Sequence, residues 1–283
     1  MKINIKEFLA SKLVVMFRLE KILIKLYPIA ISAKYSHIDP KLLNSRILQL
    51  GKLLEKTDIA EEEILRFGSD FDGGYYLLGN ITNSDSVISL GIGNNVTFEK
   101  DLSNIVESQM LYDHTIQELP EKITNATFFK IGISSTESQG FYTLKQCIEV
   151  FLPNKNLILK IDVEGDEWEV FANSSIEDLM RFKQIAVEFH NLNNIDDSVF
   201  FDKVKSALEN LRRNHVVISV HANNWSPFEI VTKVPFPDVI EVTYLRKDLL
   251  NTKRFVQKDF RPFNNPNNPN NPNNFDIQLS FLN

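Results

Sequence analysis

Apolar residues in the middle of the chain recur in short runs that alternate with amphipathic stretches. The runs that we expect to form strands are Val87–Leu90, Gln109–Tyr112, Thr127–Ile131, Leu157–Ile161, Gln184–Phe189, His215–Val220 and Val239–Leu245. The stretches with helical spacing are Thr97–Glu107, Leu144–Phe151, Glu167–Asn173 and Val199–Arg213. This alternation is typical of βαβ units, so the sequence predicts an α/β domain built on a mostly parallel sheet.

The two ends of the chain follow different patterns. Residues 1–36 are rich in Lys and Arg and place apolar residues at helical spacing, which predicts a basic amphipathic helix. Such a helix fits either an anionic membrane surface or a protein surface, on its own domain or on a second copy of the chain. A second helical stretch runs from Pro40 to about Glu63. We therefore expect a helical extension over residues 1–62, an α/β domain over 63–260 and an Asn/Pro-rich tail over 261–283.

Composition narrows the classes of partner and compartment. The net charge of −6 and the pI near 5.5 argue against a phosphate-backbone binder, so we expect no nucleic-acid partner. The single cysteine, Cys147, favours a reducing compartment and a cytoplasmic protein. Charged residues interrupt every apolar run near the start, so we expect no membrane-spanning helix.

Two glycines, Gly91 and Gly93, follow the first predicted strand and precede a predicted helix. Glycine permits a sharp turn and a close approach of ligand to backbone. A dinucleotide fingerprint would place a third glycine where Val96 stands. Asp113 ends the next strand about 20 residues on, where an acid binds ribose hydroxyls. NAD and S-adenosylmethionine both carry that ribose, so the pattern indicates a nucleoside cofactor unless Asp113 is merely a solvated strand end.

Acidic residues gather after the strand Leu157–Ile161. Asp162 falls at the carboxyl edge of the sheet, where open α/β folds bind ligands. Glu164 shares a face with Asp162 if the strand continues, or it opens a helix together with Asp166 and Glu167. We expect a site role for Asp162, a mixed role for Glu164, and helix-start charges at Asp166 and Glu167.

Polar residues also end two later strands. His190 follows one of them, and His221, Asn223 and Asn224 end the other. Strand-terminal histidines at one edge of a sheet are candidates for a general base or for hydrogen bonding to substrate. The alternative is that each histidine is a structural residue with its hydrogen bonds satisfied inside the fold.

Several motifs together resemble those of FkbM-type methyltransferases. The most specific is LKIDVEGDEWEVF (159–171), and the others in chain order are RFGSDFDGGYYL (66–77), ISLGIGNNVTFEKDL (88–102), LYDHTI (111–116), VEFHNL (187–192), HVVISVHANN (215–224) and PDVIEVTYLR (237–246). The resemblance covers residues 64–280 or so. It implies the Rossmann-like class I methyltransferase fold, a seven-stranded, mostly parallel sheet with an antiparallel last strand.

The resemblance also implies the cofactor and its contacts. The cofactor is S-adenosylmethionine, with its methionine part on Gly91, Gly93 and Asn94, its ribose on Asp113, and its sulfonium beside Asp162. The adenine would lie on Ile133 and Ser134. Ser89 stands where the glycine motif begins with an acid in the family.

The reaction expected from the resemblance is O-methylation of a sugar hydroxyl in a surface glycan or secondary product. His221 or His190 would be the base, Asp162 would orient cofactor or substrate, and the substrate-binding residues would be Glu164, Asn223 and Asn224; no residue is assigned to a metal.

Two alternatives stand beside the methyltransferase. One is a metal-dependent glycosyltransferase that uses the D-x-D of Asp70 and Asp72, although Asp72-Gly73-Gly74 also reads as a turn. The other is a non-catalytic scaffold that keeps the fold and uses residues 1–36 as an anchor, peripheral to the inner face of the membrane. A homo-oligomer is compatible with each.

Overall fold

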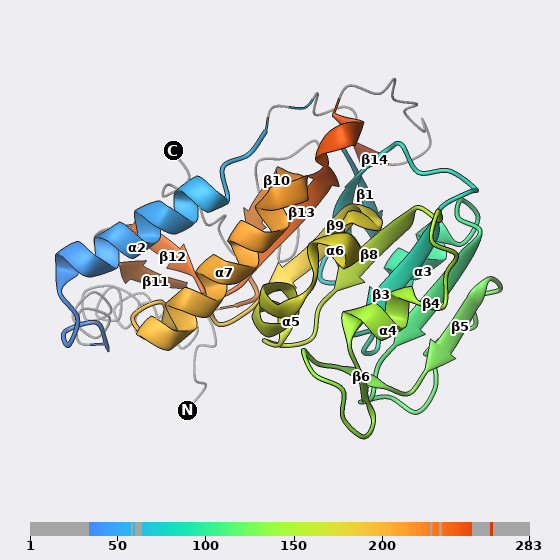
Figure 1. The fold of residues 1–283 in the computed structure, drawn as a ribbon, viewed down its shortest axis with the longest axis horizontal. Helices are drawn as coiled ribbons and strands as arrows, with labels where there is room; N and C mark the ends of the chain where they lie inside the picture. The colour runs from blue at the N-terminus through green and yellow to red at the C-terminus, as the bar shows by residue number, and fades with distance from the viewer. Residues whose placement is uncertain are drawn as a thin grey trace, which may run out of the picture.

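The computed structural model describes residues 34–57, 59, 64–226, 228–231, 234–250 and 261–262 (Figure 1). Its centre is a seven-stranded sheet with the order β10-β13-β9-β8-β3-β4-β5. These strands are β3 (Ser86–Leu90), β4 (Ser108–Tyr112), β5 (Ala126–Phe129), β8 (Leu157–Ile161), β9 (Phe182–Phe189), β10 (His215–Ala222) and β13 (Ile240–Arg246). All the strands predicted from apolar runs are confirmed, with ends that differ by one to two residues.

The strand directions match the expected class. β13 pairs antiparallel with both of its neighbours, β9 and β10, and the pairs from β9 to β5 are all parallel. The chain first builds outward from β3 through β4 to β5 and then returns to place β8 on the other side of β3. The sheet therefore has its topological switch point between β3 and β8, which is where open α/β sheets bind ligands.

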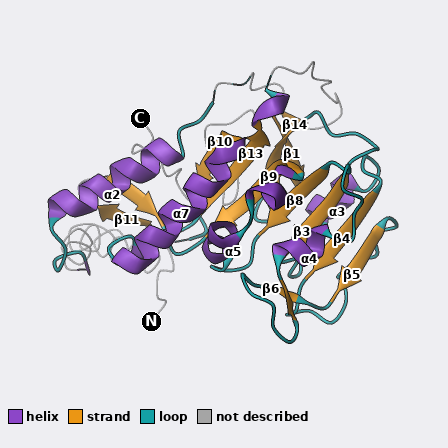
Figure 2. Ribbon diagram, in the orientation of Figure 1, coloured by secondary structure: helices purple, strands orange, loops and turns teal. Residues whose placement is uncertain are grey.

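One face of the sheet is covered by helices (Figures 1 and 2). They are α2 (Pro40–Leu53), α4 (Leu144–Ile148), α5 (Glu167–Asn173), α6 (Ile176–Met180) and α7 (Ser198–Asn214). Their apolar sides join the sheet in the main hydrophobic core. Trp168 of α5, for example, stacks on Phe189 of β9 with ring centroids 3.9 Å apart. Burial of such large aromatic surfaces is the main stabilising contribution of this layer.

The opposite face carries a hairpin that the apolar pattern did not predict. Strands β1 (Ile64–Gly68) and β2 (Gly74–Leu78) pack on the sheet beside α3 (Thr97–Leu102) and form a second core with it. Buried polar contacts fix the hairpin, because Gln184 of β9 exchanges two hydrogen bonds with the Leu78 backbone at 2.7 and 3.0 Å. The turn predicted at Asp72-Gly73-Gly74 is confirmed as the hairpin connection.

The remaining elements are short. They are β6 (Gly132–Ile133), β7 (Phe141–Tyr142), η2 (Leu192–Asn194), β11 (Phe228–Val231), β12 (Val234–Pro237), η3 (Lys247–Leu249) and β14 (Arg261–Pro262), which pairs with β1. The helix α3 ends at Leu102, five residues earlier than expected, and α2 ends at Leu53 rather than near Glu63. In the part of the chain that is described, no helix has the length and apolar character needed to cross a bilayer.

The helical extension and the α/β domain share one core. Leu43, Ile47 and Leu50 of α2 pack in the same cluster as the sheet residues. The boundary at residue 62 stays a prediction. The basic helix expected over residues 1–36 lies, apart from its last three residues, outside the described residues, and so does the NNPNNPNNPNN segment.

Candidate functional site

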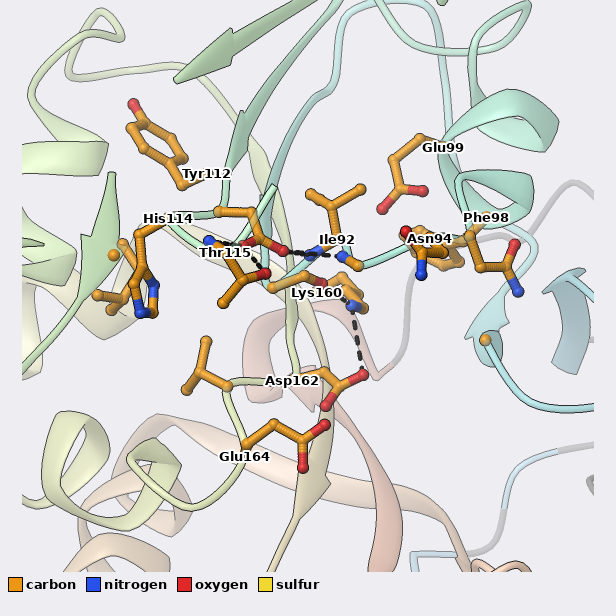
Figure 3. Close-up of a pocket in the computed structure, with 18 of the residues that line it drawn as sticks. Ile92, Asn94, Phe98, Glu99, Tyr112, His114, Thr115, Lys160, Asp162 and Glu164 are labelled. Atoms are coloured by element: carbon orange, nitrogen blue, oxygen red, sulfur yellow. Dashed lines mark hydrogen bonds and ion pairs between the residues drawn. The ribbon is translucent and has the colours of Figure 1, made fainter. Parts of the chain in front are cut away.

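A cavity of about 310 Å³ opens at the carboxyl ends of β3, β4 and β8, at the switch point of the sheet (Figure 3). Its wall combines the glycine turn after β3, the segment after β4 and the segment after β8. The β1–β2 connection contributes Asp72 and Gly73, and β2 contributes Tyr75, while Gly132 and Ile133 come from β6. Five segments that are distant in sequence therefore meet around one cavity.

The two glycines of the turn have different physical roles. Both have positive φ, +76° at Gly91 and +57° at Gly93. A Cβ at Gly91 would lie 1.7 Å from the carbonyl oxygen of Asp162, so the packing of β3 against β8 excludes any side chain there. A Cβ at Gly93 would meet nothing within 4 Å. Gly93 therefore leaves space at the cavity, while Gly91 is required by the fold itself.

Asp113 binds the glycine turn directly. Its Oδ2 accepts hydrogen bonds from the Ile92 and Gly93 backbone N–H groups, both at 2.8 Å. Its Oδ1 accepts from the N–H and the hydroxyl of Thr115, both at 2.6 Å. Burial raises the pKa of Asp113, but the hydrogen bond from Gly93 and those from Thr115 and Ile92 outweigh it and lower the pKa overall. Asp113 is therefore ionised and holds the turn in shape.

An acid that sequence reasoning missed lies beside the turn. Glu99 of α3 is 1% exposed, and its Oε1 accepts a hydrogen bond of 2.5 Å from the hydroxyl of Ser89. Burial raises the pKa of Glu99, and the nearby Lys160 partly offsets this effect. The family motif has an acid at the position of Ser89. In this chain the carboxylate beside that position comes from Glu99 of α3 instead. The only local signal was that Glu99 shares the buried side of a short helix with Leu102, three residues on.

Lys160 and Asp162 lie at the centre of the cavity wall (Figure 3). The Lys160 ammonium donates to the carbonyl of Gly91 and lies 3.5 Å from Oδ2 of Asp162. Asp162 Oδ2 also accepts a hydrogen bond of 2.8 Å from the hydroxyl of Tyr75, which comes from the hairpin. Asp162 therefore has a cavity on one side and fixed donors on the other.

Behind Asp162 lies a histidine between carboxylates. His190 Nδ1 lies 3.1 Å from Oε1 of Glu167, and its Nε2 lies 3.8 Å from Oδ1 of Asp162. Burial lowers the pKa of His190, but the hydrogen bond to Glu167 and the charges of nearby carboxylates outweigh burial and raise the pKa to about 9. Glu167 is the first residue of α5, as expected of a helix-start charge. It is fully buried and accepts hydrogen bonds from the Val163 and Gly165 backbone N–H groups at 2.7 and 3.0 Å.

A row of buried polar residues crosses the sheet from this point. His221 of β10 pairs in register with Glu241 of β13, which pairs with Glu188 of β9. The His221 Nε2 and Glu241 Oε2 atoms are 2.9 Å apart, and Asn223 donates to Glu188 Oε1 at 2.5 Å. Burial, and then the charges of neighbouring carboxylates, raise the pKa of Glu188 well above its usual value. We call His221, Glu241, Glu188 and Asp162 the polar row.

The structure brings together some of the predicted site residues and not others. Gly91, Gly93, Asn94, Asp113, Ile133, Asp162 and Glu164 line the cavity. The residues that do not line it are Ser134, His190, His221, Asn223 and Asn224. Ser134 instead borders a separate surface hollow, and its hydroxyl donates to the Thr136 carbonyl at 2.5 Å. Asn223 and Asn224 are each 4% exposed, so a substrate in the cavity does not reach them in this conformation.

Of the two alternatives for Glu164, a strand that continues past Asp162 is not what the structure has. β8 ends at Ile161, and Glu164 takes a left-handed φ of +58° in the loop before α5. Of the D-x-D, Asp72 lines the cavity, and its carbonyl accepts from the Asn95 side chain at 3.0 Å. Among the residues described, however, Asp70 and Asp72 are not in the grouping of side chains spaced to hold a metal ion.

Several solved structures with similar folds are methyltransferases by name, while no protein-family model and no curated protein matches the sequence. An rRNA methylase from Streptococcus thermophilus is 13% identical, with 59% of this chain and 89% of that chain covered and a TM-score of 0.37. The 23S rRNA methyltransferase ErmE is 10% identical over 63% and 66%, with a TM-score of 0.34. A candidate methyltransferase from Streptococcus mutans in complex with SAH is 13% identical over 58% and 89%, with a TM-score of 0.29.

The order of the sheet, with β13 alone antiparallel, decides the fold class. The fold is that of the class I methyltransferases. The identities and TM-scores above are too low to carry anything about substrate. The resemblance to FkbM-type methyltransferases rests on the sequence motifs alone.

The expectation of no nucleic-acid partner, which rests on the acidic net charge, is not supported. Solved structures with similar folds include an rRNA methylase and a 23S rRNA methyltransferase by name. Net charge describes the whole chain and not the surface around one cavity, so it does not support that exclusion.

Proposed function

We propose that this chain is an S-adenosylmethionine-dependent methyltransferase that methylates a hydroxyl oxygen of a sugar. The observation that carries the proposal is the cavity at the switch point between β3 and β8, lined by the glycine turn and by Asp113. Class I folds place their ligand at this position. The acceptor class follows the resemblance to FkbM-type methyltransferases.

The cavity suits a single nucleoside better than a dinucleotide. Its volume of about 310 Å³ is at the lower end of the range for small-molecule sites. Val96, which is 3% exposed at the start of α3, stands where the dinucleotide fingerprint has a third glycine for close packing of helix on strand. In this proposal the methionine part lies over Gly93 and Asn94, the ribose lies at Asp113, and the adenine lies against Ile133.

Asp113 can serve turn and ribose together. Its two oxygens already accept from Ile92, Gly93 and Thr115, which occupy about four lone-pair sites. A ribose hydroxyl would therefore replace or share the bonds from Thr115, which lies on the cavity wall as well. Ser134 is not among the proposed adenine contacts, because it borders a separate surface hollow.

The reaction is an in-line attack of the acceptor oxygen on the methyl carbon. Bound S-adenosylmethionine would supply the methyl group: the O–C bond would form as the S–C bond breaks, S-adenosylhomocysteine would leave, and the hydroxyl proton would pass to a base. Asp162 is the candidate base that lines the cavity. His190 is the better placed of the two histidines to assist it, with Nε2 3.8 Å from Asp162, because His221 lies two strands further along the polar row.

Polar groups on the open side of the cavity support a hydroxyl-rich acceptor. Asp72, Glu164 and Asp166 present carboxylates or backbone oxygens there, and Asn94 and Asn95 present amides. Such groups hydrogen-bond sugar hydroxyls. The Glu164 side chain is 87% exposed and is available to an incoming acceptor.

Calorimetric titration with S-adenosylhomocysteine tests the cofactor. We expect one site per chain and no heat from NAD⁺, and the reverse result would refute the proposal. The acceptor is then sought by transfer of labelled methyl groups to polysaccharide extracts and, in parallel, to total RNA. Label in RNA rather than in glycan would overturn the sugar assignment and leave the methyltransferase intact.

A further inference from the structure

Three side chains at the Asp162 end of the polar row are spaced like the ligands of a metal ion. One carboxylate oxygen each of Asp162 and Glu188 and one ring nitrogen of His190 lie within 4.8 Å of one another. Ligand atoms around a transition-metal ion with bonds of about 2.0–2.2 Å are separated by about 3 to 4 Å. Small side-chain movements therefore suffice to close the three atoms on one ion.

The orientation of His190 is a second, independent observation. Nδ1 lies 3.1 Å from Oε1 of Glu167, which is fully buried and accepts two backbone N–H groups. Since Glu167 is fixed as an acceptor, Nδ1 carries the proton. Nε2 then faces Asp162 and Glu164, whose oxygens are 3.8 and 3.6 Å away and beyond hydrogen-bond distance. Metal-binding histidines typically donate their other ring N–H to a carboxylate in this way.

The carboxylates gathered around the trio also favour a cation site. Glu188 and Glu241 are each 5% exposed, and Asp162 lies beside them. Lys160 lies 3.5 Å from Asp162, and its ammonium is shared with the carbonyl of Gly91. Buried carboxylates are costly unless they are paired or bind a metal. Tyr75 donates to Asp162 and Glu188 at 2.8 and 3.4 Å, which leaves further lone pairs on both carboxylates.

We propose that Asp162, Glu188 and His190 form a binding site for one first-row divalent cation of the Mn²⁺ to Zn²⁺ series. Two carboxylate oxygens and one imidazole nitrogen suit these ions, whereas Mg²⁺ and Ca²⁺ prefer oxygen ligands only. Three protein ligands leave coordination positions for water or for a substrate oxygen. Because Asp162 lines the cavity, one open position faces the space in which the acceptor would lie.

The role of the ion rests on the proposed function, although its binding does not. An acceptor hydroxyl bound to the ion would be held close to the methyl group, and its proton would be lost more readily. His190 as a ligand cannot take up that proton. Asp162 offers the ion one carboxylate oxygen, so its other oxygen would be the base, and the assisting role of His190 passes to the ion.

The test is a Mn²⁺ titration of the full chain after removal of metals by a chelator, followed by the loss of the free-ion EPR signal. We expect one site, weakened at least tenfold in E188Q and in H190Q. Matched surface controls are H37Q and E169Q, whose side chains are 62% and 41% exposed and lie in surface ion pairs. These controls should bind Mn²⁺ as the wild type does. Zn²⁺ should compete for the site, and Mg²⁺ should compete at least tenfold more weakly.

A second measurement uses only the wild-type protein, so it does not depend on the folding of a variant. Pulsed EPR of wild-type protein with bound Mn²⁺ should show coupling to an imidazole nitrogen, and its absence would overturn the site. Equal Mn²⁺ affinity in wild type, E188Q and H190Q would also overturn it, as would no binding at all. Titration with S-adenosylhomocysteine in chelator separates the two proposals. Nucleoside binding without Mn²⁺ binding refutes only the metal site, and Mn²⁺ binding without nucleoside binding refutes only the proposed cofactor.

Discussion

The glycine turn and the polar row lie at the same edge of one sheet, yet they are built in opposite ways. The turn between β3 and α3 uses backbone: two positive-φ glycines and N–H groups that Asp113 binds. The row across β8, β9, β13 and β10 uses buried charged side chains brought into register by strand pairing. A site made of backbone groups has a fixed shape and suits a ligand of fixed shape. The charge of a row of ionisable side chains, in contrast, changes with the ions and protons that it binds. In the proposed function the turn would hold the cofactor, and the row would reach the acceptor through Asp162, its member on the cavity wall.

The largest expected effect separates the two glycines of the turn. Gly91→Ala places a Cβ 1.7 Å from the Asp162 carbonyl oxygen and should destabilise the fold by about 4 kcal/mol or more, or prevent folding. Gly93→Ala meets no atom and should cost about 1–2 kcal/mol from its left-handed backbone, while it weakens S-adenosylhomocysteine binding. Urea unfolding measures the stability of each variant, and calorimetry measures its affinity for S-adenosylhomocysteine. Equal loss of stability in the two variants would contradict this division of roles.

His215 is a buried histidine at the start of β10, and its titration can be compared with that of the polar row at the other end of the strand. Burial is the main cause that lowers the pKa of His215 to about 4, and Arg246 adds to it. The unfolded chain has a pKa near 6.5, so it binds a proton that the folded chain refuses between about pH 6.5 and 4. Stability is therefore full above pH 6.5 and should fall by about 3 kcal/mol as the pH drops to 4.

Urea unfolding of wild type and H215Q at pH 7 and pH 4.5 isolates this contribution. H215Q should be less stable than wild type at pH 7, because the 2.9 Å contact from Nε2 to the Phe182 carbonyl is altered. The difference should vanish or reverse at pH 4.5. A constant difference at both values would show that His215 does not titrate as its burial requires.

Asp113→Ala tests whether the turn depends on its carboxylate. The change removes charge-assisted hydrogen bonds worth about 1.5–3 kcal/mol, so S-adenosylhomocysteine should bind roughly ten to a hundred times more weakly. Thr115→Val is the matched variant, because it removes one donor to Asp113 and keeps the carboxylate. Calorimetry should give it a smaller loss. An unchanged affinity in the alanine variant would remove Asp113 from the cofactor site.

The smallest effect concerns Glu164, which borders both regions. Its φ of +58° is unfavourable for a residue with a side chain, so Glu164→Gly should raise stability by up to about 1 kcal/mol. Thermal unfolding of wild type and Glu164→Gly measures the difference in melting temperature. A fall in the melting temperature would mean that the Glu164 carboxylate, 3.6 Å from His190, contributes more than its backbone costs.

The sequence predicted what is local along the chain. Runs such as Leu157–Ile161 specify buried parallel strands through composition alone, and the order of strands and helices then leads to the fold. Gly91, Gly93, Asp113 and Asp162 follow directly after such strands, so strand prediction also places them at the cavity. The same reasoning identified the turn at Asp72.

The rest depends on contacts between distant segments. Glu99 was not among the candidate residues, because it is the packing of α3 that buries it against Ser89. The row is formed by the register of β9, β13 and β10, which no motif encodes, so Glu188 and Glu241 were missed and His221 was placed at the cavity. The β1–β2 hairpin was missed because its short strands are buried on all residues and show no alternation.

The hairpin has a consequence for how such an enzyme could change its specificity. Tyr75 and Asp72 reach the cavity from β2 and its preceding turn, and the Asn95 side chain links that turn to the segment after the two glycines. Because the hairpin is a separate stretch of chain, exchanging it would reshape this side of the cavity, which is the acceptor side in the proposed function, while β3, β4 and β8 stay as they are. A graft of residues 64–78 between homologous chains is therefore the natural unit for redirecting the acceptor.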